Sequence, residues 1–108
     1  MALYVGFYWV TDDFNREVWQ KLRSGAMKLG PGEIPEPLAA KVRESVQKKP
    51  AGLEFVGSWF PLHGPAMRDE PGVAIVETND VNHLAWLASY YGGFLEFRFR
   101  PYLGVRRG

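Results

Sequence analysis

The sequence predicts a small α+β domain with four strands and two main helices in the order strand, helix, strand, strand, helix, strand, and with an extra helix before the second strand. Three observations lead to this prediction. Runs of large apolar residues with strand-like alternation recur along the chain, segments with helical apolar spacing separate them, and glycine or proline marks most boundaries. A chain of 108 residues has the usual size of one domain, so residues 1–108 are expected to share a single core.

The first strand is predicted at residues 2–10, where large apolar side chains occupy both faces of the alternating pattern. Thr11, Asp12 or Asp13 can then cap a helix, because their short side chains accept hydrogen bonds from free backbone N–H groups. Gly25 is expected to end this helix. One apolar residue recurs on each of its turns: Phe14, Val18 and Leu22.

The extra helix is predicted between two boundaries that contain proline. Residues 29–37 include three prolines and cannot continue the preceding helix. Leu38, Val42 and Val46 then recur every four residues, and Pro50 stops the run. This pattern is typical of a surface helix with one buried stripe.

The second half of the chain repeats the alternation of strand and helix. Residues 53–62 and 73–78 are rich in β-branched or aromatic residues and predict the second and third strands. A helix is predicted at residues 81–91, and the alternation at residues 94–102 predicts the fourth strand. The helix has capping residues before it and glycines after it: Asn79 or Asp80, and Gly92 with Gly93.

This element order is that of a ferredoxin-like βαββαβ domain with a four-stranded antiparallel sheet. Right-handed crossovers would put both main helices on one face of the sheet and leave the other face open. We expect Tyr4 and Tyr8 on the open face, where they are too apolar for plain solvent exposure. The sequence therefore predicts a homodimer that buries the open sheet face.

Composition excludes several classes of protein. The chain is 46% hydrophobic and 23% charged, and no run approaches the roughly 20 apolar residues that span a bilayer, so no membrane role is expected. The first residues lack the basic segment of a secretory signal, and a cytoplasmic location is the expectation. Cysteine is absent, which removes disulfides and thiolate chemistry.

Nucleic-acid binding is not expected either. Leu3-Tyr4-Val5-Gly6 resembles the first-strand signature of RNA-recognition modules with this strand order. Those modules also need aromatic rings on the third strand to stack bases, and this chain has Val73 and Ile75 there. The formal net charge of +1 adds no general attraction to phosphate.

Three residues are candidates for proton transfer: His63 in a loop, His83 at the start of the last helix, and Glu77 near the end of a central strand. Each of them can also be explained without chemistry: His63 as a loop residue, His83 as a helix residue and Glu77 as a solvated strand end. Neither histidine has the companion ligands that a metal site needs, so no metal or other cofactor is predicted. The candidate substrate-binding residues are Tyr8, Trp59, Trp86, Tyr90 and Arg98.

Several segments of the chain resemble a family of small bacterial proteins that is known only as a domain of unknown function. These segments are residues 50–59, Glu77-Thr78-Asn79-Asp80, Trp86, and Phe94-Leu95-Glu96-Phe97 with the following Pro101. That family is placed among the dimeric α+β barrels. The resemblance covers the first strand and residues 50–101, and residues 29–49 look like an insertion. It implies the fold and dimerisation, but no motif in it is catalytic.

The sequence leaves two functions open. The protein could be a cofactor-independent enzyme that acts on a small hydrophobic or aromatic molecule held between sheet and helices, or it could bind such a ligand without turnover. Convergence of His and Glu side chains beside a cavity would favour catalysis. We further predict that Trp59 and Trp86 belong to one aromatic cluster, either as core or as a ligand site.

Overall fold

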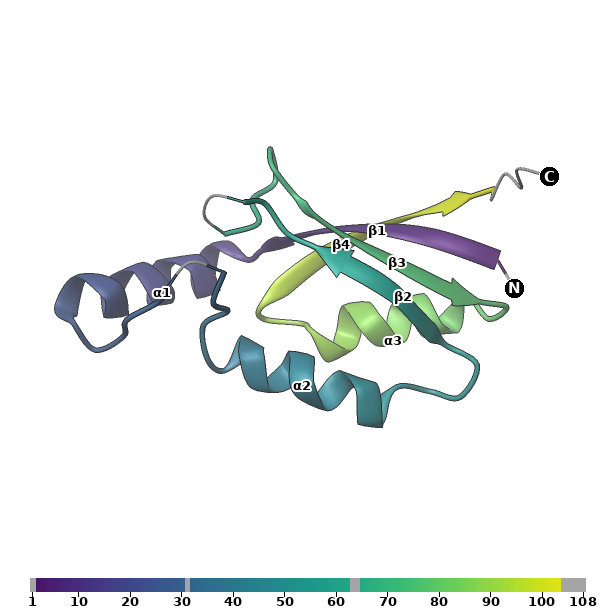
Figure 1. Ribbon diagram of the computed structural model, residues 1–108, viewed down its shortest axis with the longest axis horizontal. Coiled ribbons are helices and arrows are strands. Elements are labelled where there is room, and N and C mark those ends of the chain that lie inside the picture. The colour runs from purple at the N-terminus through teal and green to yellow at the C-terminus, as the bar shows by residue number, and fades with distance from the viewer. Residues whose placement is uncertain (1, 31, 63–64, 104–108) are drawn as a thin grey trace.

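The computed structural model describes residues 2–30, 32–62 and 65–103. The described part contains four strands and three helices, which Figure 1 labels in chain order. Their bounds are β1 Ala2–Val10, α1 Asp12–Ser24, α2 Leu38–Lys48, β2 Glu54–Trp59, β3 Gly72–Thr78, α3 Asn82–Tyr90 and β4 Leu95–Tyr102.

The four strands form one antiparallel sheet in the order β2-β3-β1-β4. β1 therefore lies inside the sheet, paired with β3 on one side and β4 on the other, and β2 and β4 are the edges. The prediction of an α+β domain with a four-stranded antiparallel sheet is confirmed. β2 is shorter than the predicted strand 53–62, and its register shifts between Phe55 and Gly57 because of a bulge at Val56.

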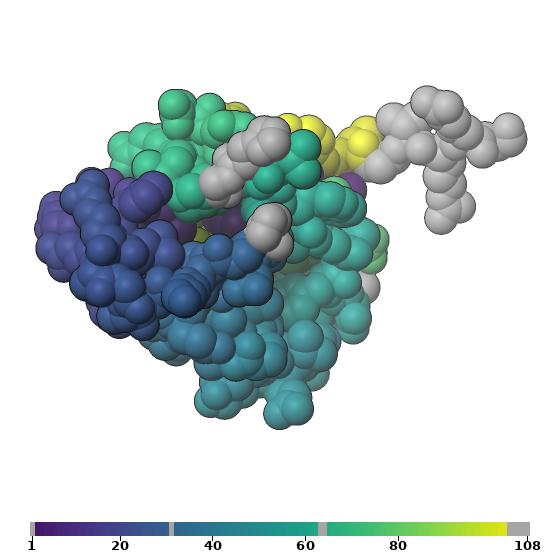
Figure 2. All heavy atoms as spheres, turned by 60° about the vertical axis from the view of Figure 1, so that its left-hand side comes forward, coloured from purple at the N-terminus to yellow at the C-terminus, as the bar shows by residue number. Residues whose placement is uncertain are grey.

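The helices are distributed unevenly around the sheet. α2 and α3 lie side by side on one face, whereas the other face carries no helix (Figure 1). α1 projects beyond the end of the sheet, and Figure 2 turns this side of the molecule toward the viewer. The molecule measures 52 × 28 × 20 Å, and the projecting α1 accounts for part of this elongation. We call the uncovered surface of the sheet the open face.

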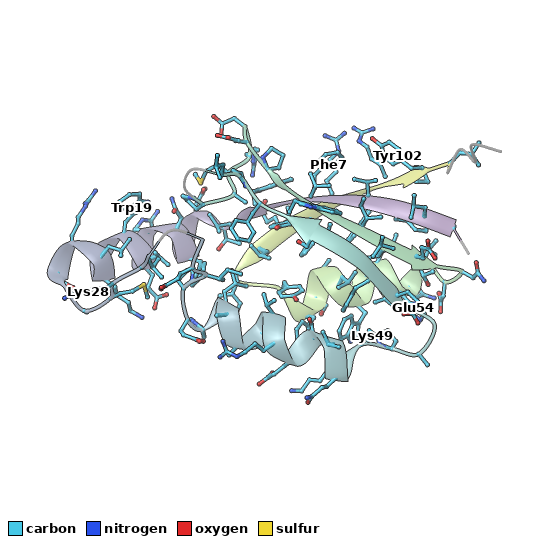
Figure 3. The ribbon with its side chains drawn as sticks, in the orientation of Figure 1. Phe7, Trp19, Lys28, Lys49, Glu54 and Tyr102 are labelled. Carbon is cyan, nitrogen blue, oxygen red and sulfur yellow. The ribbon has the colours of Figure 1, made fainter. Side chains whose placement is uncertain are left out.

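The face of β1 that lies against the helices is the opposite of the predicted one. Tyr4 and Tyr8 point toward the helices and pack against the core, so their predicted place on the open face is wrong. The open face instead carries the other alternating set of β1: Leu3, Val5, Phe7 and Trp9. Figure 3 shows Phe7 pointing away from α2 and α3.

Two glycines explain this orientation of β1. Gly72 pairs with Tyr8, and a Cβ on Gly72 would lie 2.2 Å from Cζ of the Tyr8 ring. Gly6 pairs with Phe99, and a Cβ on Gly6 would lie 2.6 Å from Cε1 of that ring. The helix-facing surface of the sheet therefore has flat places on which the two rings lie.

The first two helices follow their local signals in part. Thr11 caps α1, since its Oγ1 accepts a hydrogen bond from the Phe14 N–H at 3.3 Å, and Gly25 ends α1 with φ at +79°. In α2, Leu38 and Ser45 are buried, whereas Val46 of the predicted stripe is 62% exposed. The buried side of α2 is thus rotated from the predicted one, because it faces α3 as well as the sheet.

The core lies between the sheet and α2 and α3. Leu53 and Thr78 are fully buried, at 0% exposure each. The other buried members of the cluster come from every helix and from β3 and β4: Phe14, Leu38, Val76, Leu87, Tyr91 and Leu95. This packing fills the space between helices and sheet with apolar side chains.

Candidate functional site

An aromatic cluster occupies the region where a ligand cleft was predicted. Tyr8 and Tyr91 each lie 5.7 Å, ring centroid to centroid, from Phe97, and Phe97 stacks on Phe99 at 5.3 Å. These separations are typical of packed aromatic pairs. The rings therefore pack against one another, and this part of the described structure is a filled core.

The Tyr8 hydroxyl is tied to the edge strand β2. It donates to the backbone carbonyl of Trp59 at 3.1 Å and lies 3.1 Å from Ser58 Oγ. Because a phenol has a single hydrogen, Ser58 must donate in the second bond. Burial raises the pKa of Tyr8 above its usual value of 10.0, and the Ser58 hydrogen bond opposes that change in part.

Tyr91 is a second buried phenol close to Tyr8. Burial raises the pKa of Tyr91 as well, a hydrogen bond with Ser45 opposes that change in part, and Coulombic interactions with Tyr90 and Tyr8 add to the increase. Both phenols therefore stay protonated at neutral pH. They can donate hydrogen bonds there, but they are not bases.

Trp86 and Tyr90 form a stacked pair on α3, with ring centroids 4.9 Å apart. α2 contacts Tyr90 of this pair, because the Tyr90 hydroxyl donates to the Lys41 carbonyl at 3.1 Å and the Lys41 ammonium lies 4.6 Å from the Tyr90 ring centroid. Burial and the nearby Glu44 carboxylate raise the pKa of Tyr90. The two predicted binding residues are thus brought together, and Tyr90 makes a contact between α3 and α2.

His83 takes part in the turn that starts α3. Its Nδ1 lies 2.6 Å from Thr78 Oγ1, which also accepts a hydrogen bond from the Asp80 N–H at 3.0 Å. Its Nε2 lies 3.8 Å from Asp80 Oδ2. Aspartate, histidine and a hydroxyl are thus adjacent, as in a nucleophilic triad. Thr78 is fully buried, however, so its hydroxyl is closed to a substrate, and the group serves to hold the β3–α3 turn.

Glu77 does not join His83. Glu77 pairs with Leu3 on the open face, whereas the neighbouring Thr78 points to the helix side and contacts His83. Successive residues of a strand point to opposite faces, so the sheet separates the two candidate proton carriers. The third candidate, His63, lies outside the described residues.

Trp59 and Arg98 also lie on the open face. Trp59 pairs with Val73 and Arg98 pairs with Phe7, and residues paired across antiparallel strands share a face. Trp59 is 57% exposed, and its ring lies over Gly57. Trp59 and Trp86 therefore lie on opposite sides of the sheet, and the prediction that they form one cluster is wrong.

The open face has a polar group that sequence reasoning missed. Trp9 Nε1 donates to Glu96 Oε2 at 2.8 Å, and Arg68 pairs with the same oxygen at 3.3 Å while its guanidinium lies 5.4 Å from the Trp9 ring. Trp9 and Glu96 each follow the alternating pattern that is visible in their own strand. Arg68 comes from the loop before β3, and no local sequence pattern predicts its contact with Trp9 and Glu96.

Two hollows of the described surface lie away from these residues. One is an open depression beside α1 that includes Lys21, Met27 and Ile34, and the other follows Arg16, Trp19 and Arg23 along α1 itself. Neither reaches a predicted site residue. Residues 2–30, 32–62 and 65–103 hold no group of three or more side chains suited to bind a metal ion.

Among the described helices, none has the length and apolar character needed to cross a membrane. Comparison with curated proteins and comparison with solved structures each found no match. A family model described as Domain of unknown function (DUF3303) matches residues 28–107, a range that begins after α1 and includes residues 29–49. Because this match covers most of the chain, the protein belongs to the DUF3303 family.

Proposed function

We propose that this protein is a non-catalytic binding domain that associates with a second copy of itself through the open face. The observation that carries the proposal is the apolar centre of that face. Leu3, Val5, Phe7 and Trp9 of β1 lie beside Val73 and Ile75 of β3, and no helix of the described chain covers them. A contiguous apolar patch of this kind is typical of protein interfaces.

The strand order supports a more specific description, a ferredoxin-like subunit of a dimeric α+β barrel. β1 and β2 both pair antiparallel with β3, and the helices come between β1 and β2 and between β3 and β4. These pairings support the proposal of a split βαβ unit. In such a dimer the two open faces pack on each other as the layers of a sandwich.

Binding is favoured over catalysis by the separation of the candidate proton carriers. Glu77 faces away from the helices and His83 contacts Thr78 beneath the sheet, so the two do not act on one substrate. The space beneath the sheet is filled by aromatic rings. These features support the self-associating function rather than turnover of a small hydrophobic molecule.

The decisive experiment is sedimentation velocity over a range of protein concentrations. The unaltered chain is expected to be a dimer at micromolar concentration, and Phe7→Glu is expected to be a folded monomer, because it places a charge in the centre of the interface. Val46→Glu is the matched control, since Val46 is 62% exposed on α2, away from the sheet. A monomeric unaltered chain would overturn the proposal.

A further inference from the structure

The charged residues of the open face are distributed unevenly, and this distribution restricts how two copies can pair. Arg98 and Arg100 follow the β4 edge, where they pair with Phe7 and Val5. Glu77 lies on the other side of β1, on β3. The open face is thus basic toward β4 and acidic at one end of β3 and β2, where Glu77 pairs with Glu54.

These three charges are not neutralised within the described chain. Arg98, Arg100 and Glu77 form no ion pair with any residue of the ranges that the structure describes. By contrast, Glu96, which lies on the same face, is held by Trp9 and Arg68. Charges at the rim of an apolar face that lack a partner on their own chain set the register of association.

The β2 edge offers a receptor for a guanidinium. The Trp59 ring lies across Gly57, where a Cβ would come within 2.6 Å of the ring atom Cη2, and the side chain is more than half exposed. Gly57 pairs with Ile75, and Trp59 pairs with Val73. Across β1, these two rows of the sheet continue to Arg100 and Arg98 on β4. The Trp59 ring therefore covers the β2 side of the same rows that hold the two arginines on the β4 side. An exposed indole face is the best aromatic partner for arginine.

Two symmetric ways of stacking the open faces differ in the contacts of these arginines. With the two-fold axis along the strands, the β4 edge of each copy lies over the β2 edge of the other. With the axis across the strands, β4 lies over β4, which brings Arg98 and Arg100 of one copy against the same residues of the other. The second arrangement gathers four like charges in one place and is unfavourable.

We infer that the open face pairs two copies of the chain about an axis along the strands, with Arg98 and Arg100 of each copy over Trp59 of the other and Arg100 in reach of the second copy's Glu77. The inference rests on the proposed self-association and adds its register. Each contact occurs twice in the dimer, because a two-fold interface uses the same surface of both copies.

Charge reversal in sedimentation equilibrium tests the register. Arg100→Glu and Glu77→Arg are each expected to raise the dimer dissociation constant about tenfold or more, because each sets like charges against one another. The double variant with both reversals is expected to return to within about threefold of the unaltered chain, since the pair is restored in reversed order. Arg23→Glu on α1 has the same charge change and is expected to have no effect.

Trp59 provides an independent arm of the same experiment. Trp59→Ala is expected to weaken the dimer about tenfold, and Trp59→Phe less, because phenylalanine keeps an aromatic face. A monomeric unaltered chain would overturn the proposed function itself. A stable dimer in which the two reversals add rather than compensate, or in which Trp59→Ala has no effect, would overturn the register and leave the dimer intact.

Discussion

Tyr8 lies directly across from Gly72, and its ring occupies the space that any larger residue at position 72 would need. The Tyr8 hydroxyl is fixed at its far end by Ser58 and by the Trp59 carbonyl. The ring thus joins three strands, β1, β3 and β2, on the helix-facing side of the sheet. This contact decides which face of β1 is buried.

Gly72→Ala is expected to lower the free energy of unfolding by about 1–3 kcal/mol, because the new methyl group would overlap the Tyr8 ring. Urea unfolding followed by far-ultraviolet circular dichroism measures the loss. The same change in a Tyr8→Ala background is expected to cost much less, since the overlapping ring is gone. Equal losses in the two backgrounds would contradict the described contact.

Alkaline stability is expected to depend on Tyr8. The pKa of Tyr8 is raised in the folded chain above its usual value of 10.0, so the unfolded chain loses this proton first as the pH rises. The contribution of Tyr8 is therefore fully present below about pH 9 and decreases above pH 10. Tyr8→Phe should show a shallower loss of stability between pH 9 and 11 in urea unfolding. Parallel curves for the two proteins would show that the Tyr8 pKa is the same in both states.

Leu53 is expected to be among the most sensitive apolar positions, because it is fully buried. Leu53→Ala should lower the free energy of unfolding by about 2–5 kcal/mol, as large-to-small changes in packed cores do. Leu62→Ala is the matched control, since Leu62 is 89% exposed and its truncation should change stability by less than about 0.5 kcal/mol. Similar losses at both positions would contradict the described burial.

Thr78→Val is expected to destabilise the start of α3 by about 1–3 kcal/mol, because the Asp80 N–H loses its acceptor in a partly buried hydrogen bond. Thr78→Ser keeps the oxygen and should retain most of the stability. The nitrogen chemical shift of His83 Nδ1 should change in Thr78→Val and stay unchanged in Thr78→Ser, since the hydroxyl at position 78 is the group that contacts this nitrogen. An unchanged shift in Thr78→Val would refute the contact.

The sequence predicted the elements well where the signals are local. The Thr11 cap, the left-handed Gly25 and the alternation of β4 are each contained in a few neighbouring residues. The inward face of β1 could not be predicted in the same way. Both faces of β1 carry large apolar groups, so the two-residue period holds no information about which of them is buried.

The candidate site shows the same limit. The pairing of Trp86 with Tyr90 follows from helical spacing. The separation of Glu77 from His83 arises because successive residues of β3 point to opposite faces of the sheet, and Thr78, not Glu77, points toward His83. Arg68 reaches Trp9 from a loop 59 positions later in the chain, a contact that only the tertiary structure reveals. The crossover rule predicted α1 on the same face of the sheet as α3, whereas α1 projects beyond the end of the sheet and α2 lies beside α3.

The two edges of the sheet are poor templates for the pairing of a further strand. At β2 the bulge at Val56 interrupts the regular ladder of backbone groups, and at β4 Pro101 offers no N–H to a neighbouring strand. Further strands therefore find poor templates at either end, and growth by sheet extension is blocked. The proposed stacking of two open faces would cover the apolar centre of that face, and together with these edges it would end assembly at a finite particle.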